Sequence, residues 1–226
     1  MNISKESHAA SQGRQARSEI DYRFYDLVKR TIDVCGAIFG IIMTLPLCLL
    51  ISLSYLFEEK KGPIFFKQLR VGKNGKLFYI YKFRSMALNA EERLHSDREL
   101  YKKYVDNNYK LEPHEDPRVT TMGAFLRKTS LDELPQLINV LKGEMSLVGP
   151  RPVVKEELAE YQDHVTTFLS VKPGVTGFWQ VSGRSQVVYP ERVDVELYYV
   201  DNRSMVLDLQ IIFRTVWKVF IRSGAY

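Results

Sequence analysis

The sequence predicts an α+β protein that is mostly helical, with a small β-hairpin or sheet, interfacial amphipathic helices, and an amino-terminal re-entrant membrane helix broken at a proline. Three observations predict this class. Residues 34–57 form an uncharged apolar run that contains Pro46. An Asn-Gly pair separates two runs rich in β-forming residues, and residues 208–222 place apolar and basic side chains at helical spacing. We expect a flexible tail at residues 1–22, the re-entrant membrane helix at 23–59 and a cytoplasmic domain at 60–226.

The composition suits one buried core together with a membrane element. The chain has 226 residues, of which 45% are hydrophobic and 26% are charged, which is enough for a domain with its own core. Its net charge of +5 suits nucleic acid, anionic lipid or a nucleotide, so charge alone does not choose among these partners. Cys35 and Cys48 lie within the apolar run, and the four histidines lack zinc-site spacing. This argues against a disulfide, a zinc site and a catalytic histidine.

The apolar run begins too late and is too long to be a cleaved signal peptide. As a helix it would extend about 36 Å, against a hydrocarbon core of about 30 Å, so its length permits an ordinary span. Pro46 argues against a straight span because it removes one backbone hydrogen bond. Both flanks are basic, with six Lys and Arg in residues 1–33 and eight in 58–84, so both are expected in the cytoplasm. We therefore favour a helix that turns at Leu45-Pro46 and leaves on the side where it entered, with the straight span as the alternative.

Asp33 lies at the mouth of the apolar run, where its carboxylate must be solvated or paired. Lys29 and Arg30 lie within one helical turn of it. These three side chains are expected at the membrane interface.

Residues 64–69 and 77–83 are predicted as the two strands of a hairpin. The Asn-Gly pair between them is the strongest short signal for such a turn. On the second strand Lys82 and Arg84 are two residues apart, so they project from one face. They could form part of a binding site or guard a solvated sheet edge, and the local sequence leaves both open.

Two helices and a loop are predicted in the rest of the domain. Asn89 and Glu92 resemble a capping box at the start of a surface helix over residues 90–107. Residues 112–118 contain two prolines and are predicted as a loop whose carboxylates are solvated rather than a cation site. The helix at 208–222 either lies among lipid headgroups or packs on the core of the protein.

An adjacent carboxylate pair, Asp132 and Glu133, is predicted at a helix start. Pro135 disfavours helical geometry at the residue before it and suits the first helical position. The alternative is an earlier start, with Ser130 and Glu133 as a capping box. In both cases free backbone N–H groups and the positive end of the helix dipole face the pair, which favours ionised carboxylates and an arriving phosphate.

The pair suits phosphoryl chemistry because adjacent side chains point in different directions and can take different roles. One carboxylate could attack phosphorus and form an acyl phosphate while the other holds a cation. Such a step needs the charge of the phosphate to be neutralised, usually by magnesium and arginine. Arg127 precedes the pair by a few residues, and Arg151 is held in a turn between two prolines. The alternative is a charged helix start with a capping role only.

With these residues the chain resembles the bacterial sugar transferase family, the monotopic phosphoglycosyl transferases that start membrane-bound glycan assembly. The resemblance covers nearly all of residues 28–226. Its motifs, in chain order, are Lys29-Arg30 with Asp33 and Pro46, Lys82-Phe83-Arg84-Ser85-Met86, Asp116-Pro117-Arg118, residues 126–137, Gly143-Glu144-Met145-Ser146, Gly149-Pro150-Arg151-Pro152, residues 172–177, residues 179–184 and the terminal Gly224-Ala225-Tyr226.

The resemblance implies transfer of a hexose-1-phosphate from a UDP-sugar, with UDP-galactose the first choice and UDP-glucose the second. The acceptor would be a polyprenyl phosphate such as undecaprenyl phosphate, and UMP would be released. This would be the first membrane step of exopolysaccharide or O-antigen (lipopolysaccharide) synthesis, at the cytoplasmic face of the bacterial inner membrane. The larger relatives carry four further spanning helices, and this chain is expected to be the catalytic core alone. Nucleic acid is not an expected partner, and a homodimer is allowed.

The resemblance also implies roles for individual residues. Asp132 and Glu133 would be catalytic, with a covalent phosphosugar intermediate on Asp132 and Mg²⁺ bound by Glu133. The implied binding residues are Arg127, Arg151, Lys82 and Arg84 for the phosphates, and Gln180 and Arg184 for the nucleotide.

Two other classes of function are compatible with parts of the sequence. A basic, membrane-anchored binding protein would account for the net charge, but not for an Asp-Glu pair near two arginines. A spanning scaffold would place the amino terminus and the domain on opposite sides of the membrane.

Overall fold

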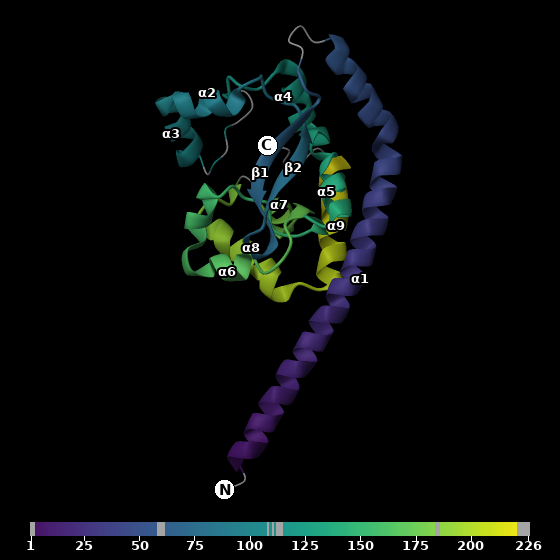
Figure 1. Ribbon diagram of the computed structural model, residues 1–226, viewed down its shortest axis with the longest axis vertical. Coiled ribbons are helices and arrows are strands. Elements are labelled where there is room, and N and C mark those ends of the chain that lie inside the picture. Colours follow the sequence, from purple (N-terminus) through teal and green to yellow (C-terminus); the bar gives the residue numbers. More distant parts are fainter. Residues whose placement is uncertain are drawn as a thin grey trace.

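A long amino-terminal helix runs along one side of a body built around a β-hairpin (Figure 1), as a computed structural model of the chain shows. The structure describes residues 3–57, 62–107, 109, 111, 115–183 and 186–220, and within these the side chains of residues 24–218. The class is α+β and mostly helical, as predicted. The elements are α1 (Ile3–Ser54), β1 (Phe65–Val71), β2 (Leu77–Phe83), α2 (Ala90–Ser96), α3 (Arg98–Asp106), α4 (Thr121–Lys128), α5 (Gln136–Lys142), β3 (Ser146–Val148), α6 (Val165–Phe168), β4 (Gly174–Thr176), α7 (Phe178–Ser182), α8 (Glu191–Asn202) and α9 (Met205–Phe220).

Helix α1 continues through Pro46, so the expected break at this proline is not found in the helix. Its upper part curves instead (Figure 1), because an α-helix accommodates the hydrogen bond lost at a proline by bending. The segment Phe24–Phe57 is 34 residues long and apolar enough to cross a membrane by length and composition. The backbone of residues 3–22, the predicted tail, belongs to the same helix.

One face of α1 belongs to the core of the domain. Ala37 is fully buried in a cluster that includes Ile80 on β2 and Val140 on α5. Further along the helix, Ile51 packs in a second cluster with Phe83. Ala37 and Ile51 are separated by about 21 Å of helix at 1.5 Å per residue. The domain therefore holds α1 along much of its apolar length.

Asp33 is bound by the domain and not by its helical neighbours. Its Oδ1 accepts hydrogen bonds from Ser146 Oγ and from the Leu147 backbone N–H, each at 2.9 Å. These bonds satisfy a carboxylate in a residue that is only 3% exposed. Lys29 and Arg30, the neighbours that the sequence suggested, make other contacts.

Lys29 and Arg30 attach the start of the apolar segment to two further helices. Lys29 Nζ lies 2.7 Å from Asp208 Oδ2 on α9. Arg30 donates to the carbonyl oxygens of Val140 and Leu141 at 2.6 and 2.8 Å. The last carbonyls of a helix have no intrahelical partner, so Arg30 caps α5.

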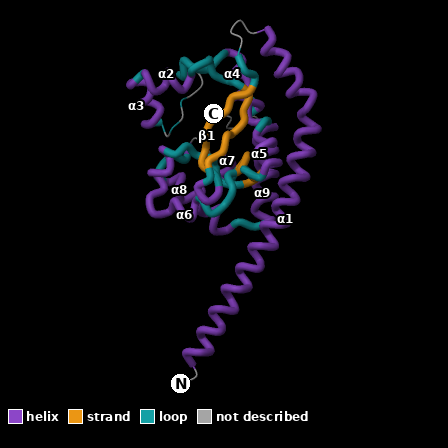
Figure 2. The backbone as a smooth tube through the Cα atoms, viewed as in Figure 1, coloured by secondary structure: helices purple, strands orange, loops and turns teal. Residues whose placement is uncertain are grey.

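The predicted hairpin is confirmed. Strands β1 and β2 are antiparallel, with Phe65 opposite Phe83 and Val71 opposite Leu77. The turn places Asn74 and Gly75 in the left-handed region, with φ of 57° and 76°, which these two residue types tolerate best. Figure 2 shows the hairpin at the centre of the body with helices on both sides. A second, parallel pair formed by β3 and β4 was not predicted.

The predicted helix at residues 90–107 is two helices, and the capping box is wrong. Asp97 separates α2 from α3, and its Oδ1 accepts hydrogen bonds from the backbone N–H groups of Glu99 and Leu100 at 3.1 and 3.0 Å. Asn89 is left-handed and makes no side-chain cap. The aspartate side chain ends one helix and starts the next because it competes for backbone donors.

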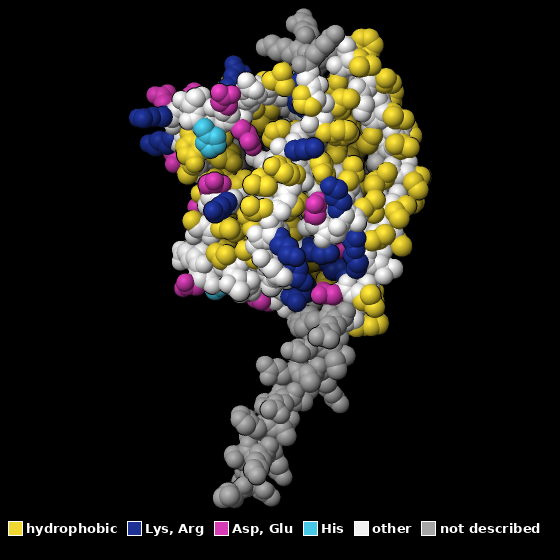
Figure 3. All heavy atoms as spheres, viewed as in Figure 1, with side chains coloured by type: hydrophobic (Ala, Val, Ile, Leu, Met, Phe, Trp, Pro, Cys, Tyr) yellow, Lys and Arg dark blue, Asp and Glu magenta, His cyan; other side chains and the backbone are white. Residues whose placement is uncertain are grey.

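One face of helix α9 packs on the core of the domain, as one of the two alternatives predicts, whereas contact with lipid headgroups stays a prediction. Asp208 and Ile211 are buried against the domain, whereas Leu209, Phe213 and Trp217 are 59–70% exposed. Apolar side chains of α1 are exposed as well, and Figure 3 shows hydrophobic side chains gathered along the edge that α1 forms. The body therefore carries an apolar surface large enough to mark a binding or membrane face.

Candidate active site

Asp132 and Glu133 lie in a short 3-10 turn, Leu131–Glu133, directly before α5. Pro135 stands at the start of α5, as the first alternative from the sequence predicts. Ser130 adopts the left-handed region, with φ of 56°, and makes no side-chain cap, so the capping box of the second alternative does not form. The turn leaves Asp132 only 6% exposed.

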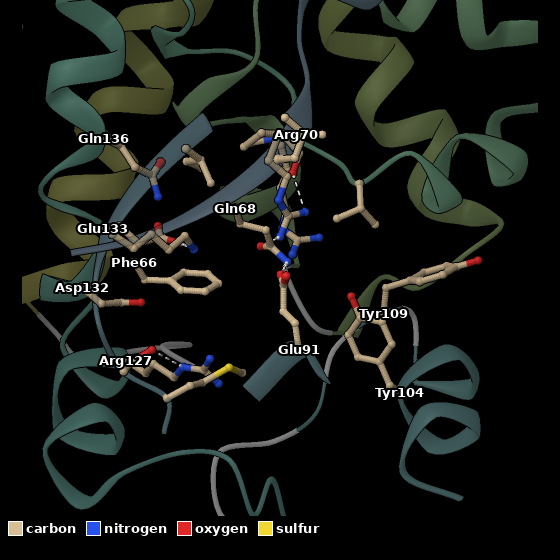
Figure 4. Close-up of a pocket in the computed structure, with 18 of the residues that line it drawn as sticks. Phe66, Gln68, Arg70, Glu91, Tyr104, Tyr109, Arg127, Asp132, Glu133 and Gln136 are labelled. Carbon is tan, nitrogen blue, oxygen red and sulfur yellow. Dashed lines mark hydrogen bonds and ion pairs between the residues drawn. The ribbon is translucent and has the colours of Figure 1, made fainter. Parts of the chain in front are cut away.

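Two cations from other elements adjoin this turn, and Figure 4 shows one of them, Arg127, near Asp132. Lys82, on β2, places its Nζ 2.7 Å from Glu133 Oε1. Arg127, in the last turn of α4, donates from Nε to Ser85 Oγ at 3.0 Å, which fixes its side chain beside the carboxylates. Strand β2, the end of α4 and the turn before α5 thus bring the predicted catalytic pair and two predicted phosphate-binding residues together, and of these only Lys82 is distant in the sequence.

Burial raises the pKa of the Asp132 carboxyl, and the negative charge of Glu133 raises it further. The positive charges of Lys82 and Arg127 act in the opposite direction. Burial also lowers the pKa of Arg127, although a guanidinium stays protonated in proteins. Asp132 is therefore a more basic carboxylate than an exposed one, which favours a role as nucleophile once it is ionised.

Arg151 reaches the site from the turn after β3, and a buried carboxylate holds it there. Its Nη1 lies 3.3 Å from an oxygen of Glu157, which is fully buried. Glu157 also lies 3.4 Å from Arg70 and 3.5 Å from Arg192. A second buried carboxylate, Glu196, accepts a hydrogen bond from the Arg151 backbone N–H at 3.3 Å. Burial raises the pKa of Glu196 to about 7.

The carboxylate pair, Lys82, Arg127 and Arg151 line one cavity of about 520 Å³, and Glu157 and Glu196 lie behind its wall. Arg84 is not among the described residues that line it, and its guanidinium carbon lies 5.2 Å from the centre of the Tyr55 ring. Arg184 lies outside the described residues. The predicted site residues in the cavity wall are Asp132, Glu133, Lys82, Arg127, Arg151 and Gln180.

Glu133 could hold a magnesium ion whose coordination a substrate completes. Mg²⁺ is usually held by one or two carboxylates together with substrate phosphates and water, and Glu133 supplies one carboxylate, with its Oε1 2.7 Å from Lys82 Nζ. No group of three His, Cys, Asp or Glu side chains suited to a metal comes together in the described part of the chain. A magnesium ion at Glu133 would therefore need oxygen ligands from a substrate and from water.

The whole arrangement of membrane helix, hairpin, carboxylate pair and α9 falls within one known family. The family model described as bacterial sugar transferase matches residues 24–222. The chain belongs to this family.

Curated relatives in the family are similar over most of this chain. An undecaprenyl-phosphate galactose phosphotransferase of Salmonella typhimurium is 47% identical, over 88% of this chain and 42% of its own length. The exopolysaccharide production protein ExoY of Sinorhizobium fredii is 43% identical, with 88% of each chain covered. A UDP-glucose:undecaprenyl-phosphate glucose-1-phosphate transferase of Escherichia coli is 36% identical, over 88% of this chain and 42% of its own length. The chain therefore spans less than half the length of some of the relatives that it matches.

In this bacterial sugar transferase, one charged residue of the cavity wall, Arg70, and two buried carboxylates that contact Arg151 were not predicted from the sequence. Arg70 is a strand residue, and Glu157 and Glu196 lie in helical segments. A lone carboxylate in such a segment is usually a solvated surface charge. Only the three-dimensional contacts with Arg151 and Arg192 reveal that they are buried and paired.

Proposed function

We propose that the protein is a phosphoglycosyl transferase that moves a hexose-1-phosphate from a UDP-sugar to a polyprenyl phosphate and releases UMP. The observation that carries the proposal is Asp132, a nearly buried carboxylate in the wall of a cavity that also presents Lys82, Arg127 and Arg151. Cationic groups around a carboxylate suit a diphosphate substrate. The names of relatives that transfer galactose and glucose support a hexose donor, with UDP-galactose the first choice and UDP-glucose the second.

In the first step an oxygen of the Asp132 carboxylate attacks the β-phosphorus of the donor. A P–O bond to Asp132 forms, the bond from phosphorus to the bridging oxygen breaks, and UMP leaves with that electron pair. The product is an aspartyl phosphosugar, which is an acyl phosphate. Lys82, Arg127 and Arg151 offset the phosphate charge that would otherwise repel the attacking carboxylate.

In the second step an oxygen of the polyprenyl phosphate, taken as undecaprenyl phosphate, attacks the same phosphorus. The bond to Asp132 breaks, the carboxylate is restored, and a polyprenyl diphosphate hexose is released. Mg²⁺ held by Glu133 would supply further neutralisation of phosphate charge in both steps. The reaction would begin exopolysaccharide or O-antigen synthesis.

Gln180, in the cavity wall, supports the binding of a nucleotide. Its Oε1 is buried, and no described residue donates a hydrogen bond to it. A buried acceptor without a partner costs about 1–3 kcal/mol. A donor N–H on the nucleotide would remove that cost on binding.

We also propose that α1 enters the membrane from the cytoplasmic side and does not cross it. Both ends of its apolar segment bind the same domain, because Asp33 is held at β3 and the Tyr55 hydroxyl donates to the Arg84 carbonyl at 2.5 Å. A spanning helix is surrounded by hydrocarbon over about 30 Å, whereas the domain packs on this one from Ala37 to Ile51. A span would draw polar groups of the domain into the hydrocarbon at high cost.

The reaction is tested with purified protein in detergent, undecaprenyl phosphate and a panel of UDP-sugars, with UMP release as the readout. Asp132→Asn should abolish UMP release. Without acceptor, a sugar-labelled donor should label the wild-type protein covalently and leave the variant unlabelled. Asp201→Asn changes an exposed carboxylate on α8 and should keep both properties. Full UMP release by Asp132→Asn would refute the mechanism, and a protein that only binds membranes would release no UMP from any donor.

The orientation of α1 is tested by labelling single cysteines in sealed vesicles with a membrane-impermeant maleimide. Ser4→Cys and Ser96→Cys are introduced separately into a chain in which Cys35 and Cys48 are replaced by Ser. The proposal expects both positions to react from the same side. Reaction from opposite sides would establish a span.

A further inference from the structure

Arg70, on β1, is a cation of the cavity wall that takes no part in the mechanism described so far. It lines the cavity although it is only 8% exposed. Figure 4 shows Arg70 between Asp132 on one side and Tyr104 and Tyr109 on the other. A buried guanidinium is costly unless other groups offset its charge. The charges around Arg70 therefore indicate whether an anionic ligand belongs beside it.

One carboxylate, Glu157, has to neutralise Arg70 and Arg151 together. Its Oε1 lies 3.4 Å from Arg70 Nη1, and its Oε2 lies 3.3 Å from Arg151 Nη1. Arg192 lies 3.5 Å from Glu157 as well. The second buried carboxylate, Glu196, lies 3.7 Å from Arg192, and because burial raises its pKa to about 7 it is only partly ionised at neutral pH. The two guanidinium groups of the cavity wall thus share less than one full negative charge each.

Arg70 also keeps hydrogen-bond donors that its neighbours do not use. Its Nη1 donates to the Pro152 carbonyl at 3.1 Å and to Glu157, and its Nη2 donates to Gln68 Oε1 at 2.5 Å. A guanidinium has five N–H bonds, so these contacts use three of them. No described residue accepts a hydrogen bond from Nε, and Nη2 has a second N–H. The exposed carboxylate of Glu91 lies beyond Gln68, whose Nε2 donates to it at 2.9 Å.

The in-line geometry of the proposed first step places the leaving nucleotide on the side of Arg70. Attacking and leaving oxygens lie roughly in line at phosphorus, so UMP leaves on the side of the cavity opposite Asp132. Arg70 lies in that direction from Asp132 (Figure 4), and Glu157 joins its guanidinium to that of Arg151. As the bond to the bridging oxygen breaks, negative charge develops on the α-phosphate of UMP. Two guanidinium groups that share a carboxylate are suited to that charge.

We propose that Arg70 binds the α-phosphate of the nucleotide together with Arg151 and stabilises UMP as the leaving group. This inference deepens the proposed function and rests on it, because it uses the in-line exchange at Asp132. The phosphate supplies the negative charge that Glu157 alone does not provide. Lys82 and Arg127 then act on the phosphate group that Asp132 attacks.

The test measures the dissociation constants of UMP and of uridine by calorimetry, with the full chain in detergent. Neither ligand turns over, and uridine lacks only the phosphate. The variants are Arg70→Gln, Arg70→Lys, Arg151→Gln and the double variant Arg70→Gln with Arg151→Gln. Lys67→Gln is the matched control, since Lys67 is an exposed cation on the same strand that does not line the cavity. Melting temperatures and UMP release from UDP-sugars are measured in parallel.

Arg70→Gln should raise the dissociation constant of UMP about tenfold, the effect of one lost hydrogen bond to a charged group, and leave that of uridine unchanged. Arg70→Lys keeps the charge and loses the planar fork of donors, so its effect on UMP should be smaller, about threefold. This variant carries the test if Arg70→Gln does not fold. Lys67→Gln should change neither constant. An unchanged dissociation constant of UMP in the folded Arg70 variants, or an equal change for UMP and uridine, would overturn the proposal.

The double variant separates direct binding from a positioning role. If Arg70 acted only by fixing the turn that carries Arg151, Arg70→Gln would have no further effect in protein that already carries Arg151→Gln. Direct contact with the phosphate predicts a further loss of about tenfold in that background, and no further loss would overturn the proposal. Absence of UMP release from every UDP-sugar by the wild-type protein would instead refute the proposed function, and this role of Arg70 with it.

Discussion

Replacing Glu157 by Gln should destabilise the protein more than any single change of an exposed carboxylate, because one buried charge holds three guanidinium groups. Glu157 is fully buried, and its oxygens lie 3.3 Å from Arg151, 3.4 Å from Arg70 and 3.5 Å from Arg192. Glutamine keeps the shape of the side chain and removes only its charge. In the variant the three guanidinium groups lose the negative charge that neutralises them, which destabilises the folded protein.

The size of the effect follows from the geometry. Removing one partner of a buried ion pair costs about 3–5 kcal/mol. We expect the lower end of this energy range because the three ion-pair distances are longer than ideal. In addition, the Arg151 side chain is 24% exposed, so water partly screens its charge. A loss of about 3 kcal/mol corresponds to a fall of roughly 6–12 °C in melting temperature for a chain of this size.

The assay is thermal unfolding in one detergent, followed by circular dichroism. Asp163→Asn is the control, since Asp163 lies in the same 3-10 segment as Glu157 but is exposed, and its melting temperature should not change. A melting temperature of Glu157→Gln equal to that of the control would show that the three arginines do not depend on this charge, and the reasoning would fail.

Three further predictions concern the site and the membrane face. Glu133→Gln removes a negative charge that raises the pKa of Asp132, together with the carboxylate that would hold Mg²⁺; in magnesium-free protein the pKa of the Asp132 carboxyl, followed by carbon-13 NMR, should therefore fall, and a rise would contradict this. Asp208→Asn weakens the bond from Lys29 that joins α9 to α1, and should lower stability by about 2 kcal/mol, measured by thermal unfolding against wild type. Phe213→Glu places a charge on a side chain that is 70% exposed; it should reduce flotation with anionic liposomes without lowering the melting temperature, and unchanged flotation would exclude this face of α9 from the membrane.

Local chemistry allowed the hairpin and the carboxylate pair to be predicted from the sequence. Asn74 and Gly75 tolerate the left-handed backbone that a tight turn needs, and Pro135 marks a helix start. The break between α2 and α3 was missed because Asp97 is equally acceptable on the solvated face of a continuous helix. The helix propensity of the surrounding residues gave no reason to place a helix N-cap at Asp97.

Contacts between distant segments were beyond the reach of sequence patterns. Asp33 had two cations within a helical turn, yet its partners are Ser146 and Leu147. The burial of Glu157 likewise depends on arginines from β1, from the turn after β3 and from α8. Periodicity describes which face of an element is apolar, but it does not say which polar groups another element will bring to that face.

Because one face of α1 packs on the domain, the proposed membrane anchor is also a structural part of that domain. Ala37 and Ile51 cover Ile80 and Phe83, so a chain cut after the helix would expose these apolar side chains to water, at a cost of about 25 cal/mol for each Å² exposed. Trimming the anchor to obtain a water-soluble enzyme should therefore fail. During synthesis α1 leaves the ribosome before its partners on α5, so in the proposed arrangement one face of the helix would enter lipid before the other face has packed on the domain. Delivery to the bilayer and completion of the active centre are then one assembly process.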